Sequence, residues 1–165
     1  MRSPTQMLVA CSYKSASKSE VDEYVQSVIS GDEEYSNTIF EALCNDPRKA
    51  RGKLEEYLRS AFPDFQVTSD LGIEECKREL VFQIQRLLSK RCSQEEFRSF
   101  FLAIESDLMM DCDDFWGDLY NGCDCFDEKW NFLDNDYLLE EAQRVLDNLL
   151  AEQAAAPNQI PRLGL

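Results

Sequence analysis

The chain has 165 residues, 44% hydrophobic and 11% aromatic, which suffices for one domain with a hydrophobic core and excludes a disordered chain. Its formal net charge of −15 at pH 7 disfavours binding to nucleic acid or to an anionic membrane, because both are themselves negatively charged. The sequence contains no histidine, so catalytic triads built on that residue are excluded. We predict a single all-α domain over residues 1–165, a helical bundle with additional N-terminal helices.

The first residues, MRSPTQMLVACSY, contain a single apolar run. This run is too short for a convincing signal peptide. It is compatible with a short strand, with the lead-in to a helix or with a disordered tail.

The additional N-terminal helices are predicted over residues 17–62. Ser17 and Glu20 have the spacing of a capping box, in which each side chain binds the backbone N–H of the other residue. Gly31 lies where the helix that they open should end. A second helical pattern covers residues 32–44. Its expected apolar face consists of Tyr35, Ile39, Phe40 and Leu43.

A third N-terminal helix is predicted to begin at Pro47, because proline is favoured at the first helical position, and to end before Pro63. Its expected apolar stripe consists of Leu54, Tyr57, Leu58 and Ala61. The same helix is the most basic part of the chain, and we interpret its basic side chains as a solvated face. These residues are Lys49, Arg51, Lys53 and Arg59.

Residues 63–72 are the best candidate for a boundary, because proline, aspartate, serine and glycine cluster there. Apolar periodicity then predicts a four-helix bundle over residues 73–150, with helices at 73–90, 93–108, 114–127 and 136–149. The first two should form an antiparallel pair, since only a few residues join them. Ser93 and Glu96 have the spacing of a second capping box, which opens the second of these helices. Two glycines weaken the third by up to ~1 kcal/mol each relative to alanine. Residues 153–165 are predicted to be a mobile tail.

The acidic stretch, residues 105–141, carries most of the net charge of the chain. It contains thirteen aspartates and glutamates, one basic residue, Lys129, and both tryptophans of the sequence. A merely soluble surface mixes charges of both signs, so this imbalance favours a surface that binds a basic protein. The aromatic rings could anchor in pockets of that partner or belong to the core. The candidate partner-binding residues are Asp113, Asp114, Trp116, Asp118, Tyr120, Asp124, Asp127, Glu128 and Trp130.

The acidic stretch does not match the common metal sites or catalytic motifs. Cys112, Cys123 and Cys125 lack the second close pair, or the histidine, of a structural zinc site. The EF-hand pattern fails, although the aspartates of residues 111–114 could still hold a divalent ion loosely. A cysteine nucleophile would have no histidine to activate it, and no glycine-rich phosphate loop is present. We therefore expect no catalytic residues, no metal site, no cofactor and no enzymatic activity.

The seven cysteines are odd in number, and most lie within helical patterns. This usage is typical of a reduced intracellular protein in which thiols serve as small apolar residues. No stretch approaches the roughly 18 apolar residues of a membrane-spanning helix. We expect a cytoplasmic protein whose partners include neither membrane nor nucleic acid.

The arrangement of the C-terminal half carries a family resemblance. The segment RLLSKRCSQEEFRSFFLAIESDL covers the predicted helix pair. Its residues at the places that recur in the family named below are Ser93, Glu96, Phe97 and Glu105. The acidic and aromatic segment DLYNGCDCFDEKW follows. The closing helix then carries Leu138, Glu141, Val145 and Leu146. In this arrangement residues 73–150 resemble immunity proteins of bacterial toxins, in particular the colicin D immunity type, whose compact members have no counterpart to residues 1–65.

The resemblance implies a helical bundle that binds the nuclease domain of a toxin. Its acidic surface would occupy the basic site that otherwise holds RNA or DNA, and the implied toxin contacts are Asp118, Asp124, Asp127 and Glu128. The alternative is a nucleic-acid mimic, or an acidic regulatory module, that binds a different basic protein.

Overall fold

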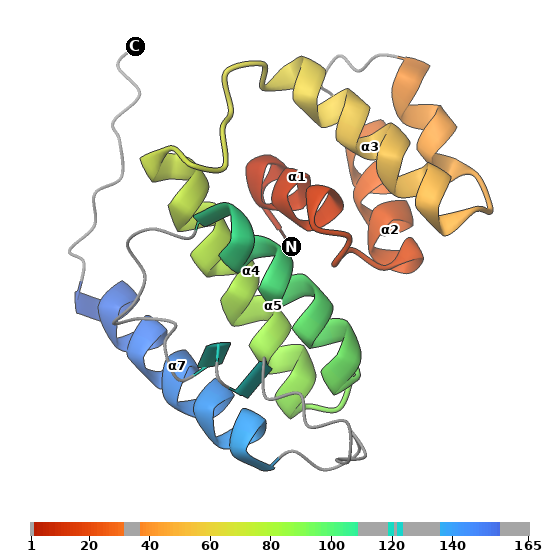
Figure 1. The fold of residues 1–165 in the computed structure, drawn as a ribbon. Coiled ribbons are helices and arrows are strands. Elements are labelled where there is room, and N and C mark those ends of the chain that lie inside the picture. The colour runs from red at the N-terminus through yellow and green to blue at the C-terminus, as the bar shows by residue number, and fades with distance from the viewer. Residues whose placement is uncertain (1, 32–36, 109–118, 121, 124–135, 156–165) are drawn as a thin grey trace.

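The computed structural model describes residues 2–31, 37–108, 119, 120, 122, 123 and 136–155 (Figure 1). It confirms the predicted all-α class, since the described part of the chain forms helices and no strand. The N-terminal helices are α1 (Pro4–Ser12), α2 (Lys18–Ile29), the 3₁₀ helix η1 (Asn37–Leu43) and α3 (Pro47–Ala61). The C-terminal helices are α4 (Asp70–Leu88), α5 (Gln94–Leu108) and α7 (Asp136–Ala155). Residues 119–120 and 122–123 are also helical.

The apolar run at the N-terminus forms helix α1. Ser3 caps the helix by accepting a hydrogen bond from the backbone N–H of Gln6 at 3.0 Å, and Pro4 occupies the first position. Residues 7–11 are consecutive in sequence and all buried. A helix that is covered on all sides is apolar all round, so the run shows no helical period.

Two hydrophobic cores meet at α1. The N-terminal core joins Leu8 and its neighbours in α1 to α2, η1 and α3. The C-terminal core joins Val9 and Tyr13 to α4, α5 and α7. In Figure 1, α1 accordingly lies between α3 and α4, and it contacts both. The N-terminal helices therefore pack directly on the C-terminal bundle.

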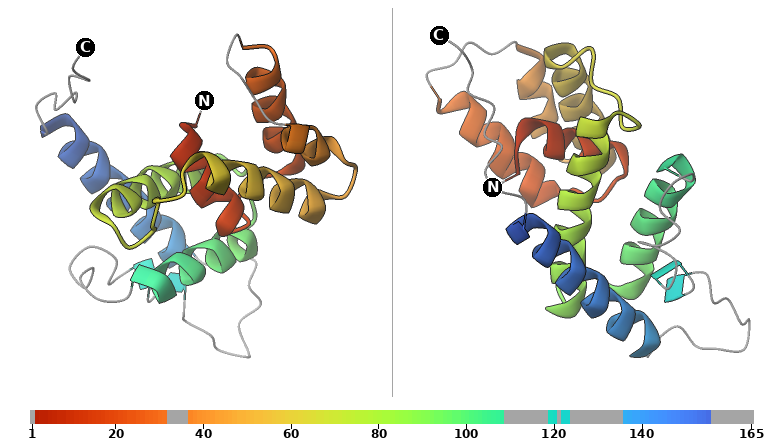
Figure 2. Two further views of the ribbon diagram at one scale, coloured as in Figure 1. Left: turned by 90° about the horizontal axis from the view of Figure 1, so that it is seen from above. Right: turned by 90° about the vertical axis from the view of Figure 1, so that its left-hand side faces the viewer.

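Helix α4 is the central helix of the C-terminal part, with α5 and α7 on either side (Figure 2). The antiparallel pairing of α4 and α5 is confirmed (Figure 1), and the second capping box with it. The backbone N–H of Ser93 donates to Glu96 at 2.8 Å, and that of Glu96 donates to the Ser93 hydroxyl at 3.1 Å. The buried apolar residues of the two outer helices include Phe97, Phe100, Phe101 and Ile104 on α5 and Leu138, Ala142, Val145 and Leu149 on α7.

The capping box at Ser17 and Glu20 is also confirmed, and α2 ends just before Gly31. The predicted helix over 32–44 differs, because the described part, 37–43, is a 3₁₀ helix. Its period of three residues places Ile39 and Ala42 on the same buried face. Phe40, expected on the apolar face, is instead 44% exposed. Tyr35 lies outside the described residues.

Helix α3 begins at Pro47 and ends before Pro63, as predicted, with Asp46 accepting hydrogen bonds from two backbone N–H groups of its first turn. Leu54 and Leu58 are buried. Ala61 is exposed rather than part of the stripe, and the buried alanine is Ala50, one turn before Leu54. Along this helix the apolar stripe therefore starts and stops one turn earlier than expected.

Two glycines, one in the predicted boundary at 63–72 and one in the predicted helix at 114–127, lie where two segments pack closely. At Gly72, in the first turn of α4, a Cβ atom would lie 2.1 Å from the carbonyl oxygen of Gln66. At Gly122, a Cβ atom would lie 3.3 Å from the Cα atom of Leu138 in α7. Both glycines allow the backbones of two segments to approach each other closely.

The last described helix, α7, extends to Ala155, so residues 153–155 continue the helix into the segment predicted to be a tail. Its buried stripe consists of Leu138, Ala142, Val145, Leu146 and Leu149. Residues 156–165 lie outside the described part. Within the described ranges, no helix combines the length and the apolar character needed to cross a membrane.

Candidate functional site

The predicted partner-binding residues fall almost entirely outside the described part of the chain. This applies to Asp113, Asp114, Trp116, Asp118, Asp124, Asp127, Glu128 and Trp130. Tyr120 is described: it is half-buried and packs against the C-terminal core, in accordance with the interpretation of this ring as a core residue.

The two ends of the acidic stretch are described, and they lie on helices fixed to α4. The stretch begins on the last turn of α5 and ends on the first turns of α7. Asp107 accepts a hydrogen bond from the Tyr13 hydroxyl at 2.8 Å, and Glu141 pairs with Arg144 at 2.8 Å. Asp136 and Glu140 are exposed and have no cation or donor among the described residues. The stretch is thus anchored at both ends to the C-terminal core.

Metal and thiol chemistry finds no support in the described residues. No three residues of the types Cys, Asp and Glu gather there to hold a metal ion. Burial, followed by the charges of neighbouring carboxylates, raises the pKa of Cys76 to about 12. Burial likewise raises the pKa of Cys11 to about 12. Both thiols therefore remain protonated at neutral pH, in the form that is a poor nucleophile and a poor ligand. Cys112 and Cys125 lie outside the described residues.

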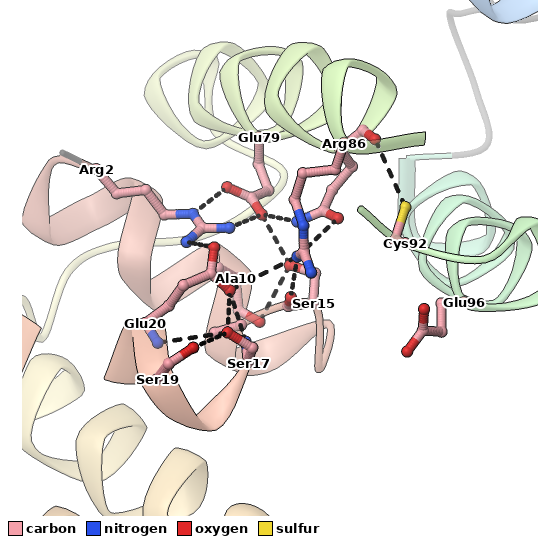
Figure 3. A network of polar contacts seen from close by, with 12 residues as sticks. Arg2, Ala10, Ser15, Ser17, Ser19, Glu20, Glu79, Arg86, Cys92 and Glu96 are labelled. Atoms are coloured by element: carbon pink, nitrogen blue, oxygen red, sulfur yellow. Dashed lines mark hydrogen bonds and ion pairs between the residues drawn. The ribbon is translucent and has the colours of Figure 1, made fainter. Parts of the chain in front are cut away.

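A largely buried polar cluster connects the N-terminal helices to α4, and we call it the polar joint: Arg2, Glu20, Glu75, Glu79, Gln83 and Arg86. Figure 3 shows Arg2, Glu20, Glu79 and Arg86. Its centre is a two-pronged ion pair, in which Arg2 Nε and Nη2 donate to the two carboxylate oxygens of Glu79 at 2.7 and 2.9 Å. Both side chains are buried, with Glu79 0% exposed. The guanidinium of Arg2 also stacks over the Phe82 ring at 4.0 Å.

The Glu79 carboxylate accepts three further hydrogen bonds. They come from Ser15 at 2.8 Å, from Gln83 at 2.7 Å and from Gln6 at 3.2 Å. Because an unpaired buried carboxylate is costly, this full set of donors explains how α4 tolerates a charge at a completely buried position. The same donors occupy its oxygens, so Glu79 is not available as a general base.

Glu20 links the joint to the start of α2. Arg2 Nη1 donates to it at 2.9 Å, and Arg86 lies 3.6 Å away. Burial alone would raise the pKa of Glu20, but hydrogen bonds from Ser17 and the charges of Arg2 and Arg86 outweigh it, so that the pKa is lowered from 4.5. The capping carboxylate of α2 is therefore held in its charged form first by Ser17 and then by the charges of Arg2 and Arg86.

Glu75 completes the joint one turn before Glu79 on α4. It accepts hydrogen bonds from Ser3 at 3.3 Å and from Thr5 and Arg78 at 3.0 Å. Each carboxylate of the joint thus has partners inside the fold, which makes the joint a structural connection between helices. The polar joint is hard to predict from the sequence, because polar residues at positions 75, 79 and 83 have the spacing of an ordinary solvated helix face.

Comparisons with protein-family models, with curated proteins and with solved structures found no match to this chain. Its function is therefore inferred from its own residues and their arrangement.

Proposed function

We propose that this chain is a binding protein without catalytic activity, and that its acidic stretch covers a basic surface of another protein. The observation that carries the proposal is the local charge: thirteen acidic residues against a single lysine over residues 105–141. Such a field attracts a cationic partner and raises the rate of encounter by ~10- to 10³-fold at low salt. It also disfavours nucleic acid and anionic lipid as partners.

The class of partner follows from the resemblance of residues 73–150 to toxin immunity proteins. We propose a nuclease toxin domain as the partner, with the carboxylates standing in for the phosphates of its substrate. The proposed contacts remain Asp118, Asp124, Asp127 and Glu128, with Trp116 and Trp130 as anchors. An immunity protein of this kind acts in the cytoplasm of the cell that makes the toxin, and we propose that location.

The supporting structural feature is the rigid attachment of the two ends of the acidic stretch. Both α5 and α7 pack on α4 through a continuous buried core. Helices fixed in this way limit the conformational entropy that the intervening stretch loses when it binds. This supports a binding segment that is held at both ends rather than a free acidic tail.

The identity of the partner is tested by affinity capture from the native cell, followed by mass spectrometry. We expect a stoichiometric basic domain from the C-terminus of a large secreted protein, which is then purified and assayed for nuclease activity with and without this chain. Capture of a housekeeping enzyme that acts on DNA or RNA would instead identify a nucleic-acid mimic. Capture of no basic protein at low salt would contradict both forms of the proposal.

The binding surface is tested by reversing charges in pairs. The double variant Asp124→Lys and Asp127→Lys should bind more weakly. The loss should be ~2 to 5 kcal/mol for each carboxylate that is buried and paired in the complex. For a carboxylate at the rim, the change should appear mainly as a slower association rate. The matched control replaces Glu23→Lys and Asp64→Lys, two exposed acids outside the stretch. Equal effects of the two pairs would show that net charge alone, and not the acidic stretch, attracts the partner.

A further inference from the structure

Three adjoining cavities open around the turn between α1 and α2. In contrast to the acidic stretch, they have basic side chains in their walls. Lys14, in that turn, borders all of them. An inner cavity of about 130 Å³ lies between the turn, Arg51 of α3 and Arg86 of α4. An outer cavity of about 550 Å³ continues along α3 past Arg51, Arg48 and Gly52. Lys14 and Arg51 border both cavities.

The cations at these cavities are only partly neutralised. Arg51 is half-buried, yet its guanidinium makes a single hydrogen bond, from Nη1 to the carbonyl oxygen of Ala16 at 3.3 Å. Arg86 uses only Nη1 within the fold, on Ser15, Gln83 and Glu20. The remaining nitrogens of both guanidiniums have no acceptor among the described residues. A guanidinium carries five N–H donors in a fixed fork, so both retain donors for an external acceptor.

Glu95 borders only the third cavity and is exposed, whereas the acidic residues of the inner and outer cavities are already engaged. In the outer cavity, Glu55 accepts hydrogen bonds from Arg59 at 2.8 Å and from Ser12 at 2.9 Å. In the inner cavity, Glu96 belongs to the capping box of α5 and accepts from the backbone N–H of Ser93 at 2.8 Å. Neither carboxylate pairs with Lys14, Arg51 or Arg86 in the described structure. A local excess of positive charge results, although the chain as a whole has a net charge of −15.

One backbone feature at the cavities has no role in the packing. It is not the left-handed Lys14, whose φ of 59° ends α1 and lets the backbone N–H of Ser15 donate to the carbonyl oxygen of Ala10 at 2.9 Å. Gly52 lies in the interior of α3, where glycine costs about 1 kcal/mol relative to alanine. A Cβ atom at Gly52 would meet nothing within 4 Å, so no contact in the fold requires glycine there. A side chain at this position would occupy the space of the outer cavity.

We infer that these cavities form a binding site for a small phosphorylated molecule. Its phosphoryl groups would lie between Lys14 and Arg51, within reach of Arg86 on the inner side and Arg48 on the outer side. Arginine forks match the geometry of phosphoryl oxygens, and the outer cavity has the volume typical of a small-molecule pocket. A net negative charge of the chain does not by itself prevent this, because charges separated by more than ~8 Å are largely screened at physiological salt. Gly52 leaves room for the rest of the molecule beside α3.

The test is isothermal titration calorimetry of the full chain at 0.15 M salt with pyrophosphate, with ADP and with adenosine. We expect ADP to bind with a dissociation constant below ~1 mM, and adenosine, which has no phosphoryl group, not to bind. Pyrophosphate that binds as tightly as ADP would show that the phosphoryl groups supply the recognition. Tighter binding of ADP would add a contribution from the organic part. Absence of binding of both up to ~10 mM, or equal binding of adenosine, would overturn the inference.

Variants locate the site on the cavities. Arg51→Gln should weaken ADP binding at least tenfold, whereas Arg91→Gln, which removes an exposed arginine outside the cavities, should leave it unchanged. Gly52→Gln fills the outer cavity with a good helix former, so we expect it to abolish binding while the unfolding temperature stays the same or rises. Retention of wild-type affinity in both Arg51→Gln and Gly52→Gln would overturn the assignment, whatever the other measurements give.

Discussion

Two regions of this molecule are rich in carboxylates, and they differ in how the negative charge is balanced. In the polar joint, Glu79 is completely buried and receives five hydrogen bonds, two of them from Arg2. In the acidic stretch, thirteen carboxylates are accompanied in sequence by one lysine. The joint satisfies its charges with residues brought from up to 77 positions away in the chain. The stretch has almost no cation of its own to do the same.

The comparison separates a structural use of carboxylates from a proposed recognition use. A carboxylate that is buried with its donors fixes how two helices meet, and losing one donor is costly. Carboxylates that outnumber local cations are suited to a partner that brings the opposite charge. Mutations in the two regions should accordingly affect different quantities, stability in the first and affinity in the second.

The largest expected effect on stability is that of Arg2→Met. It keeps most of the apolar length of the side chain but leaves Glu79 buried without its cation, which should lower the free energy of unfolding by ~3 to 5 kcal/mol. Urea denaturation measures it, with Arg91→Met as the exposed control. A loss of less than ~1 kcal/mol would show that the remaining donors suffice and that the ion pair is not central to the joint.

The apolar side of the same helix provides the reference. Leu80 is 1% exposed in the C-terminal core, so Leu80→Ala should cost ~2 to 5 kcal/mol by leaving a cavity. Val81, its half-buried neighbour, is the control and should cost distinctly less when changed to alanine. Similar losses for the two would contradict the position of Leu80 at the centre of this core.

Acid should weaken the joint through Glu20. Because the pKa of Glu20 is lowered from 4.5 in the folded chain, its contribution to stability is present above that value and is lost as the pH falls through the folded pKa. The difference in unfolding temperature between the wild type and Glu20→Gln should therefore shrink as the pH falls below 4.5 and through the folded pKa. Glu23→Gln, on the same helix but exposed, is the matched control. A difference that stays constant with pH would contradict the assignment.

The smallest effects distinguish the two capping boxes. Both Ser17→Ala and Ser93→Ala remove an N-cap and should cost ~0.5 to 2 kcal/mol. Ser17 also donates to Glu20, which is the residue that binds Arg2, whereas in the described structure no hydrogen bond or ion pair links Ser93 or Glu96 to the joint. We expect the loss for Ser17→Ala to be the larger of the two in thermal or urea denaturation. The reverse order would show that the joint does not depend on the α2 cap.

Much of the fold could be predicted because its signals are local. Capping pairs at Ser17 and Ser93, the proline at position 47 and the apolar periods of α4, α5 and α7 fix helices within a few residues of sequence. The class and the antiparallel pairing of α4 and α5 follow from them. Helix α4 nevertheless begins earlier than its apolar period indicates, at Asp70, because Ser69 caps it.

What could not be predicted depends on contacts between distant segments. Helix α1 is buried on all sides, so its apolar run lacks the one-sided period that marks a helix packed on one face. The pairing of Arg2 with Glu79 cannot be inferred from spacing, since 77 residues separate them. The sequence predicts Arg51 on a solvated face of α3, whereas its guanidinium reaches the turn between α1 and α2 and borders two cavities. Of the candidate partner-binding residues, only Tyr120 lies within the described part, where it packs on the core.

The most direct test of the central claim is the dissociation constant for the captured basic domain, measured between 50 and 500 mM salt, a range that shortens the screening length from roughly 14 to 4 Å. Binding through the acidic stretch predicts an affinity that falls steeply with salt, mainly through a slower association rate, and a weaker salt dependence in the Asp124→Lys and Asp127→Lys double variant. An affinity that does not change across this range would contradict the role of the acidic stretch as the binding surface.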